Sequence, residues 1–282
     1  MTTTTPKLAA TDLLNDRYGS SFPEDFLEDF LWNEHIRNLL VHRSVRSYLS
    51  KPLPKGTLET LIAAAQSAAS SSNLQLWSVV AVEDPARKER LSVLARNQVH
   101  IRQVPLFLVW LADLSRARNI AQSRNSTSEG LEYLETFLTG AIDASLAAQN
   151  AVVAAESLGL GTVYVGAIRN NPEAVAKELN LPPLVFPVFG LSVGYPDPDN
   201  IPIVKPRLGQ SAVLHREEYS TEAQEEAIAE YDRIMTDFYQ QQQTGVNVDW
   251  STHSTARIAT AAALGGRDRL TEVLHNLGFA IR

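Results

Sequence analysis

The sequence predicts an α+β fold on the basis of two observations. Four short segments, at 77–82, 104–112, 162–165 and 184–193, have the β-branched and apolar composition of buried strands. The segments between them have helical periodicity but unequal lengths, unlike the regular strand–helix–strand units of a doubly wound parallel sheet. We therefore expect a sheet flanked by helices, without internal repeats.

The chain begins with a segment that we expect to be a loose arm, residues 1–22. Pro23, Glu24 and Asp25 are typical of the first turn of a helix. We expect that helix to continue to Leu40 with an apolar stripe along one side.

Further helices are predicted where a capping residue or a proline precedes an apolar-periodic stretch. They span residues 57–69, 85–96, 172–179, about 221–240 and about 251–276. Polar residues at 70–73 and 121–130 are expected to form loops.

Residues 131–158 predict one long helix. Its 28 residues would span about 42 Å at 1.5 Å per residue. Apolar side chains and alanines occupy several of its faces. We expect this helix to be buried all round, by its own core and by another subunit.

Composition excludes several classes of protein. The 282 residues carry a formal net charge of −7, which argues against a general nucleic-acid binder. No cysteine is present, so disulfides, thiolate nucleophiles and iron–sulfur clusters are excluded. The six histidines lack metal-ligand spacing, and we expect no metal site. The longest apolar run has nine residues, well short of the about 20 that span a membrane. Since no signal-peptide pattern opens the chain, we expect a cytoplasmic protein.

Two glycine motifs are better explained by structure than by catalysis. Gly190 to Gly194 fits the Gly-x-Ser-x-Gly pattern of a hydrolase, which needs a helix directly after the strand. Pro196 and Pro198 follow instead and disfavour that helix. Gly159 and Gly161 lie between a helix and a strand, the reverse of the order in a dinucleotide fingerprint, and suit a helix end and a turn.

Two basic clusters suggest a pocket for an anionic cofactor. Residues 42–46 (His-Arg-Ser-Val-Arg) place two guanidinium groups, an imidazole and a hydroxyl in five residues, and guanidinium suits bidentate phosphate binding. Residues 205–207 (Lys-Pro-Arg) place two cations in a loop that Pro206 stiffens. Taken alone, the first cluster is better explained as a solvated basic turn, and the second is also compatible with surface charge.

Eight collinear motifs resemble the nitroreductase superfamily. Its branch of the major oxygen-insensitive nitroreductase and the flavin reductase of P type is the most similar. The resemblance runs from about residue 38 to the C-terminus, so we expect an extension at 1–37 and one FMN-binding domain at 38–282 with a C-terminal helical part. The motifs lie at 42–46, 70–75, 148–151, 155–161, 164–166, 169–171, 189–190 and 205–208.

The resemblance implies FMN bound at the interface of an intertwined homodimer, within a sandwich of a mostly antiparallel sheet and helices. A phosphate favours charge-assisted hydrogen bonds, and a glycine lets the backbone approach a flavin ring closely. The residues that the family pattern assigns to the cofactor are His42, Arg43, Ser44 and Arg46 at the phosphate and ribityl chain, Lys205 and Arg207 as further cations, and Ser70, Asn73, Gln98, Tyr164, Val165, Gly166 and Ala167 at or beside the ring.

Two positions depart from that branch. Ala167 stands where a second glycine is usual, and Asn73 stands where a phenylalanine lies near the active site. Asn73, Gln75 and Trp77 instead resemble the Asn-x-Gln-Pro-Trp pattern of shorter nitroreductases. The resemblance therefore does not define which residues form the substrate side of the pocket.

The resemblance implies an FMN-dependent oxidoreductase. It would take a hydride from NADH or NADPH and pass two electrons, by a ping-pong mechanism, to nitroaromatics, quinones or flavins, with no catalytic acid or base from the protein. Two alternatives stay open. One is another flavin enzyme on the same scaffold, of dehalogenase or flavin-destroying type, and the other is a flavin sensor or store without turnover.

The electron donor can be predicted from one stretch. NADPH-preferring members of this branch carry several arginines on a C-terminal loop, whereas no lysine or arginine lies between Arg233 and Arg257 here. We expect only a weak preference for NADPH, with NADH used at least comparably.

Overall fold

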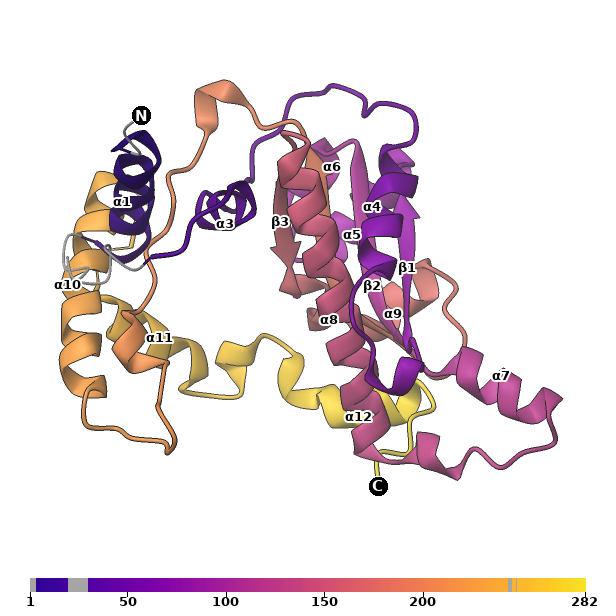
Figure 1. Cartoon of the computed structure of the whole chain (residues 1–282). Coiled ribbons are helices and arrows are strands. Elements are labelled where there is room, and N and C mark those ends of the chain that lie inside the picture. Colours follow the sequence, from indigo (N-terminus) through magenta and orange to yellow (C-terminus); the bar gives the residue numbers. More distant parts are fainter. Residues whose placement is uncertain (1–3, 20–29, 243–244, 247) are drawn as a thin grey trace. The chain divides into compact units, whose positions relative to one another are not determined.

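The computed structural model describes residues 4–19, 30–242, 245–246 and 248–282, and side chains from residue 10 onward. The chain forms two compact units (Figure 1). Unit 1 comprises Met1–Arg43 and Ile203–Leu264, and unit 2 comprises Ser44–Pro202 and Gly265–Arg282.

Unit 2 contains one antiparallel sheet of four strands. They are β1 (Trp77–Val82), β2 (Leu106–Asp113), β3 (Gly161–Val165) and β4 (Val185–Gly194), in the order β1-β2-β4-β3. All four predicted strands are present, and the α+β class is confirmed. β2 begins two residues later than predicted, because Pro105 has no N–H group to donate to a neighbouring strand.

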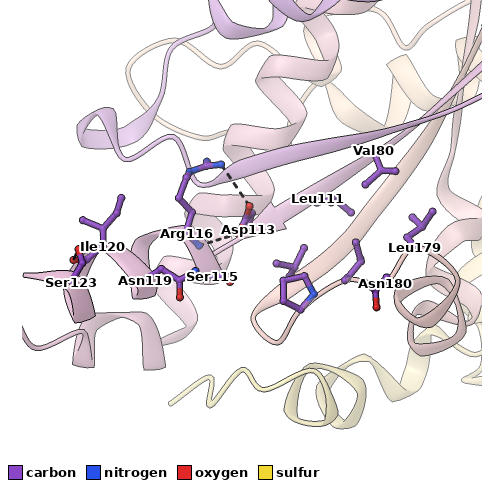
Figure 2. Close-up of a pocket in the computed structure, with 13 residues that line it drawn as sticks. Val80, Leu111, Asp113, Ser115, Arg116, Asn119, Ile120, Ser123, Leu179 and Asn180 are labelled. Atoms are coloured by element: carbon purple, nitrogen blue, oxygen red, sulfur yellow. Dashed lines mark hydrogen bonds and ion pairs between the residues drawn. The ribbon is translucent and has the colours of Figure 1, made fainter.

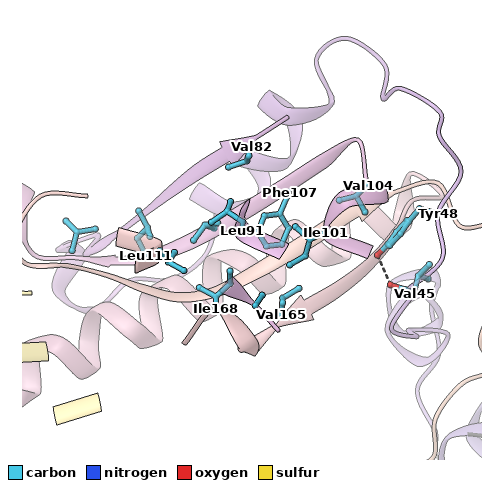
Figure 3. Close-up of a cluster of buried hydrophobic side chains, with 14 residues drawn as sticks. Val45, Tyr48, Val82, Leu91, Ile101, Val104, Phe107, Leu111, Val165 and Ile168 are labelled. Atoms are coloured by element: carbon cyan, nitrogen blue, oxygen red, sulfur yellow. Dashed lines mark hydrogen bonds between the residues drawn. The ribbon is translucent and has the colours of Figure 1, made fainter. Parts of the chain in front are cut away.

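Both faces of the sheet are buried, because alternate residues of β2 point to opposite sides. Phe107 and Leu111 belong to a cluster with Ile101 and other side chains on the side of α5 (Pro85–Leu94), α6 (Val99–Gln103) and α9 (Pro172–Glu178) (Figure 3). Leu108 and Trp110 pack on the other face, against α4 (Thr57–Gln66) and the alanines of α8 (Leu134–Ser157). This explains why β2 is an uninterrupted apolar run.

Two helices of unit 2, starting at Pro85 and Pro172, begin at the predicted prolines, whereas Gly56 rather than Thr57 occupies the N-cap position of α4, without a side-chain cap. Asp84 accepts a hydrogen bond from the Arg87 amide at the start of α5, and Pro85 occupies its first turn. The predicted loop at 121–130 begins later than expected, since α7 extends to Ser123. The helices are α4 (Thr57–Gln66), α5 (Pro85–Leu94), α6 (Val99–Gln103), α7 (Ser115–Ser123), α8 (Leu134–Ser157), α9 (Pro172–Glu178) and α12 (Leu270–Asn276).

The long helix α8 is not buried all round within this chain. Its alanine face packs on the sheet, with Ala144 and Ala151 fully buried. An apolar stripe at every fourth position remains 44–57% exposed: Leu134, Leu138, Ile142 and Leu146. The chain itself thus buries one face of α8, and burial of the exposed stripe by a second subunit stays a prediction. By length and composition alone, α8 could also cross a membrane.

The predicted helix at 251–276 is broken. It consists of α11 (Trp250–Ile258) in unit 1 and α12 in unit 2, with short 3₁₀ turns between them. Gly265 and Gly266 have φ angles of 67° and 93°, and this left-handed conformation ends helical structure.

Unit 1 is helical in the residues that the structure describes. Besides α11 it contains α1 (Thr4–Tyr18), α3 (Glu34–Leu40) and α10 (Gln224–Gln241). Its core joins aromatic side chains of α10, such as Tyr231 and Phe238, to Trp250.

Two N-terminal predictions differ from this structure. The expected loose arm contains helix α1, whose Ala10 and Leu14 are buried four residues apart. α3 begins only at Glu34, where the Asn33 side chain accepts a hydrogen bond from the Ile36 amide. The predicted start at residues 23–25 lies outside the described residues. α3 buries no residue, so its predicted apolar stripe is not part of a core.

Candidate flavin site

One candidate segment lies along the start of β3. Ser44 forms a parallel bridge with Thr162, and the Val45 amide donates to the Thr162 carbonyl oxygen at 2.9 Å. Gly161 permits this approach, since a Cβ atom there would lie 2.8 Å from the Val45 side chain. Ser44 and Arg46 are thereby brought to the strand that leads into residues 164–167.

Arg46 is an available cation. Its side chain is exposed and, within the described part of the chain, makes no hydrogen bond or ion pair. Its charge acts on His100, because Arg46 and the burial of the imidazole together lower the pKa of His100 to about 4, burial being the larger cause. Arg46 and His100 therefore lie in one electrostatic environment.

Gln98 is held in place by its backbone and its side chain. Arg96 and Asn97 both adopt left-handed conformations, with φ angles of 61° and 55°, and turn the chain into α6. The Ser92 hydroxyl donates to the Gln98 carbonyl oxygen at 2.9 Å. The Gln98 amide oxygen lies 3.2 Å from Nε2 of His100.

Residues 164–167 continue from the end of β3 into a 3₁₀ turn, Gly166–Asn170. The Tyr164 hydroxyl donates to the Gln149 side chain at 3.3 Å. Burial raises the pKa of this phenol, and the negative charge of Glu156 raises it further. A Cβ atom at Gly166 would meet nothing nearer than Arg169, at 3.5 Å. The space beside the Gly166 backbone is therefore not filled by packing. Ala167 packs against the core instead.

Ser70 and Asn73 lie in a loop that Asp143 organises. The Asp143 carboxylate is 1% exposed and accepts hydrogen bonds from the Ser70 hydroxyl (2.9 Å) and the Leu76 amide (3.0 Å). The Ser70 oxygen also accepts from the Gln75 amide at 2.8 Å. The Ser70 hydroxyl thus shapes the loop, whose residues Ser72, Asn73 and Gln75 have positive φ angles.

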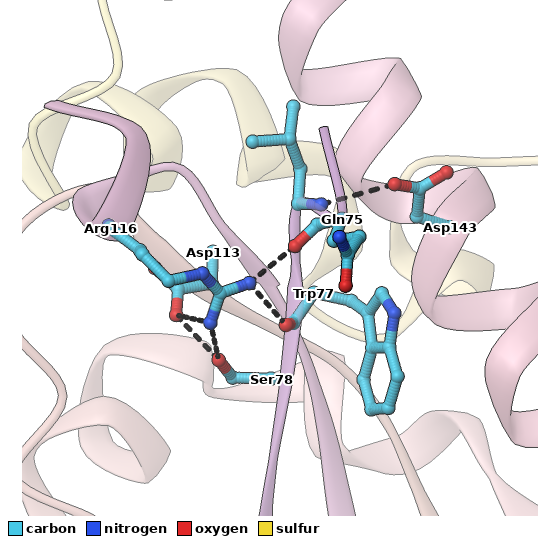
Figure 4. A network of polar contacts seen from close by, with 7 residues as sticks. Gln75, Trp77, Ser78, Asp113, Arg116 and Asp143 are labelled. Atoms are coloured by element: carbon cyan, nitrogen blue, oxygen red, sulfur yellow. Dashed lines mark hydrogen bonds and ion pairs between the residues drawn. The ribbon is translucent and has the colours of Figure 1, made fainter. Parts of the chain in front are cut away.

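Arg116 fixes the other side of this loop. Its guanidinium donates to the carbonyl oxygens of Gln75 and Trp77 and to the Ser78 hydroxyl, and it pairs with Asp113 at 3.6 Å (Figure 4). Together with Asp143, it holds the end of the loop at the start of β1.

One chain does not bring this loop to Arg46. Asp143 and Glu156 are thirteen residues apart on α8, or about 20 Å along the helix. Asp143 binds Ser70, whereas Glu156 accepts a hydrogen bond from Thr162, the residue that pairs with Ser44 and Val45. The structure thus gathers Ser44, Arg46, Gln98 and residues 164–167, and places Ser70 and Asn73 elsewhere.

The remaining candidates belong to unit 1, where Arg17 holds their segments together. Its guanidinium donates to the carbonyl oxygens of Leu40 (2.7 Å), His42 (2.9 Å) and Lys205 (3.0 Å). The Arg207 amide donates to the Arg17 carbonyl oxygen at 2.8 Å. Both basic clusters are therefore anchored to the end of α1.

Lys205 and Arg207 line a cavity of about 370 Å³ in unit 1. The Lys205 ammonium lies 5.6 Å and 5.5 Å from the centroids of the Phe238 and Tyr239 rings. His253 and Arg257 line the same cavity. Arg43 lines a neighbouring cavity of about 450 Å³ together with residues of α1 and α10.

Sequence reasoning missed three residues that hold these candidates. Arg17, Asp143 and His100 are 7%, 1% and 6% exposed, and each contacts a predicted site residue or its backbone. The spacing of Ala10, Leu14 and Arg17 was the available signal for Arg17.

A larger cavity lies away from every predicted site residue. It measures about 660 Å³ and is lined by apolar side chains such as Val80, Leu111 and Leu179 and by polar residues of α7 (Figure 2). We assign it no function.

The donors in each unit suit FMN. Exposed guanidinium groups can bind a phosphate, and an amide side chain beside an open glycine backbone can contact a flat heterocycle. No group of three or more histidine, aspartate or glutamate residues is placed to hold a metal within the described ranges. Fold and side chains thus define an α+β protein with the donor set of a flavin site.

The chain belongs to the nitroreductase family. The family model described as Nitroreductase family matches residues 39–195, and that of the Nitroreductase family, C-terminal domain, matches residues 205–282. The predicted resemblance is confirmed.

Named relatives cover most of the chain. An FMN reductase (NADPH) of Bacillus subtilis is 40% identical over 223 residues, which is 78% of this chain and 89% of the relative. An oxygen-insensitive NADPH nitroreductase of Salmonella typhimurium is 38% identical over 248 residues, 88% of this chain and 98% of the relative.

Solved structures show the same fold. The structure of B. megaterium NfrA2 has a TM-score of 0.83 at 40% identity, and the NADPH:FMN oxidoreductase of Vibrio harveyi complexed with NAD⁺ has a TM-score of 0.78 at 34% identity. Each matches 89% of this chain and 100% of the other.

Proposed function

We propose that this chain is an NAD(P)H-driven, FMN-dependent oxidoreductase that reduces nitroaromatics, quinones or flavins. One observation carries the proposal: in a member of the nitroreductase family, unit 2 brings Ser44 and Arg46 to β3, which continues into residues 164–167, and links Gln98 through His100 to Ser192, opposite Val163 of β3. Relatives named as FMN reductases and nitroreductases support it.

The basic residues would hold the phosphate and ribityl chain of FMN. These are His42, Arg43, Lys205 and Arg207 in unit 1 and Ser44 and Arg46 in unit 2. Each charge-assisted hydrogen bond to a phosphate contributes about 1.5–3 kcal/mol. Such binding would keep the cofactor in place through repeated turnover.

The ring would lie against Gln98 and the backbone of residues 164–167. Bound FMN supplies the chemistry of accepting a hydride and releasing two electrons. The protein supplies no acid or base in this proposal: burial and Glu156 raise the pKa of Tyr164, and burial and Arg46 lower that of His100. Both groups are therefore neutral at pH 7.

A second copy of the chain would complete the site. The apolar stripe of α8 is exposed here, and the Ser70 loop lies about 20 Å along α8 from the Thr162 region. In an isologous dimer, the partner would cover the stripe and supply Ser70 and Asn73. The proposal takes residues 38–282 as one FMN-binding domain with residues 1–37 as its extension, needs no metal, nucleic acid or membrane, and places the enzyme in the cytoplasm.

Anaerobic reduction tests this function. The protein purified with FMN should be yellow, lose its absorbance near 450 nm on addition of NADH or NADPH, and regain it with a quinone or nitroaromatic acceptor. Parallel initial-rate lines would support the ping-pong order. A flavin that stays oxidised with both nucleotides would favour a sensor or store, and a protein that binds no FMN would refute the proposal.

Light scattering tests the proposed dimer. It should give the mass of two chains, and a monomer with tightly bound FMN would refute the shared site.

A further inference from the structure

Ser192 is a polar residue inside the sheet. It lies on β4 opposite Phe107 of β2 and Val163 of β3, and it is fully buried. Its two glycine neighbours in the Gly-x-Ser-x-Gly pattern are explained by packing, because Cβ atoms there would overlap the Phe107 ring and Pro105. Ser192 is thus no accessible nucleophile, although it lies beside a histidine.

The burial of Ser192 sets the direction of a hydrogen-bond chain. A buried hydroxyl needs an acceptor for its proton. Within the described part of the chain, the hydrogen-bond partner of Ser192 Oγ is Nδ1 of His100, 3.0 Å away. Ser192 therefore donates to Nδ1, which leaves the imidazole proton on Nε2.

The same chain continues to Gln98. Nε2 of His100 lies 3.2 Å from Oε1 of Gln98, and an amide oxygen can only accept. The donor order is therefore Ser192 to His100 to Gln98. A neutral imidazole is required, since an imidazolium would donate from both nitrogens and leave the Ser192 proton without an acceptor. Burial and the Arg46 charge lower the pKa of His100 to about 4, which keeps it neutral at pH 7.

This hydrogen-bond chain determines which polar group of Gln98 remains available to a ligand. Its amide oxygen is occupied by His100 and its backbone carbonyl by Ser92, so the side-chain NH₂ group remains for a neighbour. A flavin ring presents carbonyl oxygens and ring nitrogens as acceptors, and these gain negative charge when the ring is reduced. A donor suits them, whereas an amide oxygen would repel them.

We propose that Ser192 and His100 are positioning residues that fix the Gln98 amide, so that it presents a hydrogen-bond donor to the bound flavin. The proposal rests on the proposed function in one respect, namely that Gln98 contacts FMN. The hydrogen-bond chain itself is a property of the protein without cofactor.

The first test uses the apoprotein. In ¹⁵N-histidine NMR at pH 7, His100 should show a protonated Nε2 and an unprotonated Nδ1, its signals being assigned by their loss in His100→Gln. Ser192→Ala removes the donor to Nδ1 and should move the signal of this unprotonated nitrogen further from the protonated range, whereas Ser123→Ala, which removes an exposed hydroxyl of α7, should leave it unchanged. An Nδ1-protonated His100 in the wild type would refute the proposed donor order from Ser192 to His100 to Gln98, whether or not the protein binds flavin.

The second test is a double-mutant cycle on FMN affinity, followed by flavin fluorescence. Gln98→Ala and Ser192→Ala should each weaken FMN binding, by about threefold to tenfold for one net hydrogen bond. In the Gln98→Ala background, Ser192→Ala should change the affinity less than twofold, since it acts through Gln98. An equal loss in both backgrounds would show a merely structural role and overturn the proposal. A wild type that binds no FMN refutes the proposed function and the flavin part of this inference, while the tautomer result still decides the chain.

Discussion

The two units hold their candidate residues in different ways. In unit 2, Gln98 is tied through His100 to Ser192 on an interior strand, and residues 164–167 continue directly from β3. In unit 1, His42 and Lys205 are anchored through their backbone carbonyls to a single guanidinium, Arg17.

This difference suits the two parts of the proposed ligand FMN, its flavin ring and its phosphate. A ring needs donors at fixed positions, which buried strands supply, whereas a phosphate tolerates mobile cations if their loops are held. Arg17 lies on α1, before residue 39 where the family match begins. Unit 1 thus depends on a segment outside the matched region, and unit 2 does not.

The largest expected effect is a loss of stability when a substitution disturbs the packing between strands of unit 2. A Cβ atom at Gly190 would overlap the Phe107 ring, so Gly190→Ala should destabilise the protein by about 1–3 kcal/mol. Gly130→Ala is the control, because nothing lies within 4 Å of a Cβ atom there. Urea unfolding measures both, and equal midpoints for the two variants would contradict the packing account.

The next effect concerns the anchor of unit 1. Arg17→Ala removes three hydrogen bonds to carbonyl oxygens, and we expect FMN affinity to fall about tenfold to a hundredfold. Arg17→Lys should lose nearly as much, since an ammonium lacks the planar fork of donors. The exposed Arg37 of α3 gives a control, Arg37→Ala, with unchanged affinity. Titration of the apoprotein with FMN measures the loss, and wild-type affinity in Arg17→Ala would contradict the anchoring role.

The third effect is a pH dependence of the folding stability that arises from His100 in unit 2. The pKa of His100 falls from 6.5 to about 4 on folding, so the unfolded chain binds the proton more tightly between these values. The stability from the neutral imidazole is complete above pH 6.5 and is lost as the pH falls toward 4, by at most about 3 kcal/mol at 1.36 kcal/mol per pKa unit. Unfolding at pH 7 and pH 4.5 should therefore show a smaller loss for His100→Gln than for the wild type. Identical losses would mean that His100 titrates normally.

The smallest effect concerns the electron donor. No lysine or arginine lies between Arg233 and Arg257, although Arg257 and His253 line the unit 1 cavity with Lys205 and Arg207. We expect kcat/KM for NADH at least comparable to that for NADPH. Steady-state rates with both donors decide this, and a preference for NADPH above about a hundredfold would contradict it.

The sequence predicted what depends on local pattern. β1 begins and ends at the predicted residues, 77 and 82, because its apolar, partly β-branched run leaves little choice of structure. For α8, the sequence predicted more apolar surface than one core can cover, but it did not predict which face stays exposed, because periodicity cannot show which apolar face the same chain covers.

The supporting residues of the site could not be predicted for a related reason. His100 acts with Ser192, 92 positions along the chain, and Arg17 binds carbonyl oxygens, which every residue has. Neither pairing leaves a pattern in the sequence. The basic clusters at 42–46 and 205–207 were recognisable by their composition, whereas the residues at the ring were found only as a family pattern. The contacts of both groups with FMN stay a prediction.

The most direct test of the division between phosphate and ring compares FMN with riboflavin, which lacks the phosphate. Dissociation constants for both are measured with the wild type, Arg207→Ala and Gln98→Ala. We predict that Arg207→Ala weakens FMN binding about tenfold or more and leaves riboflavin binding nearly unchanged, whereas Gln98→Ala weakens both by a similar factor. Equal losses of FMN and riboflavin in Arg207→Ala, or a loss confined to FMN in Gln98→Ala, would contradict the account.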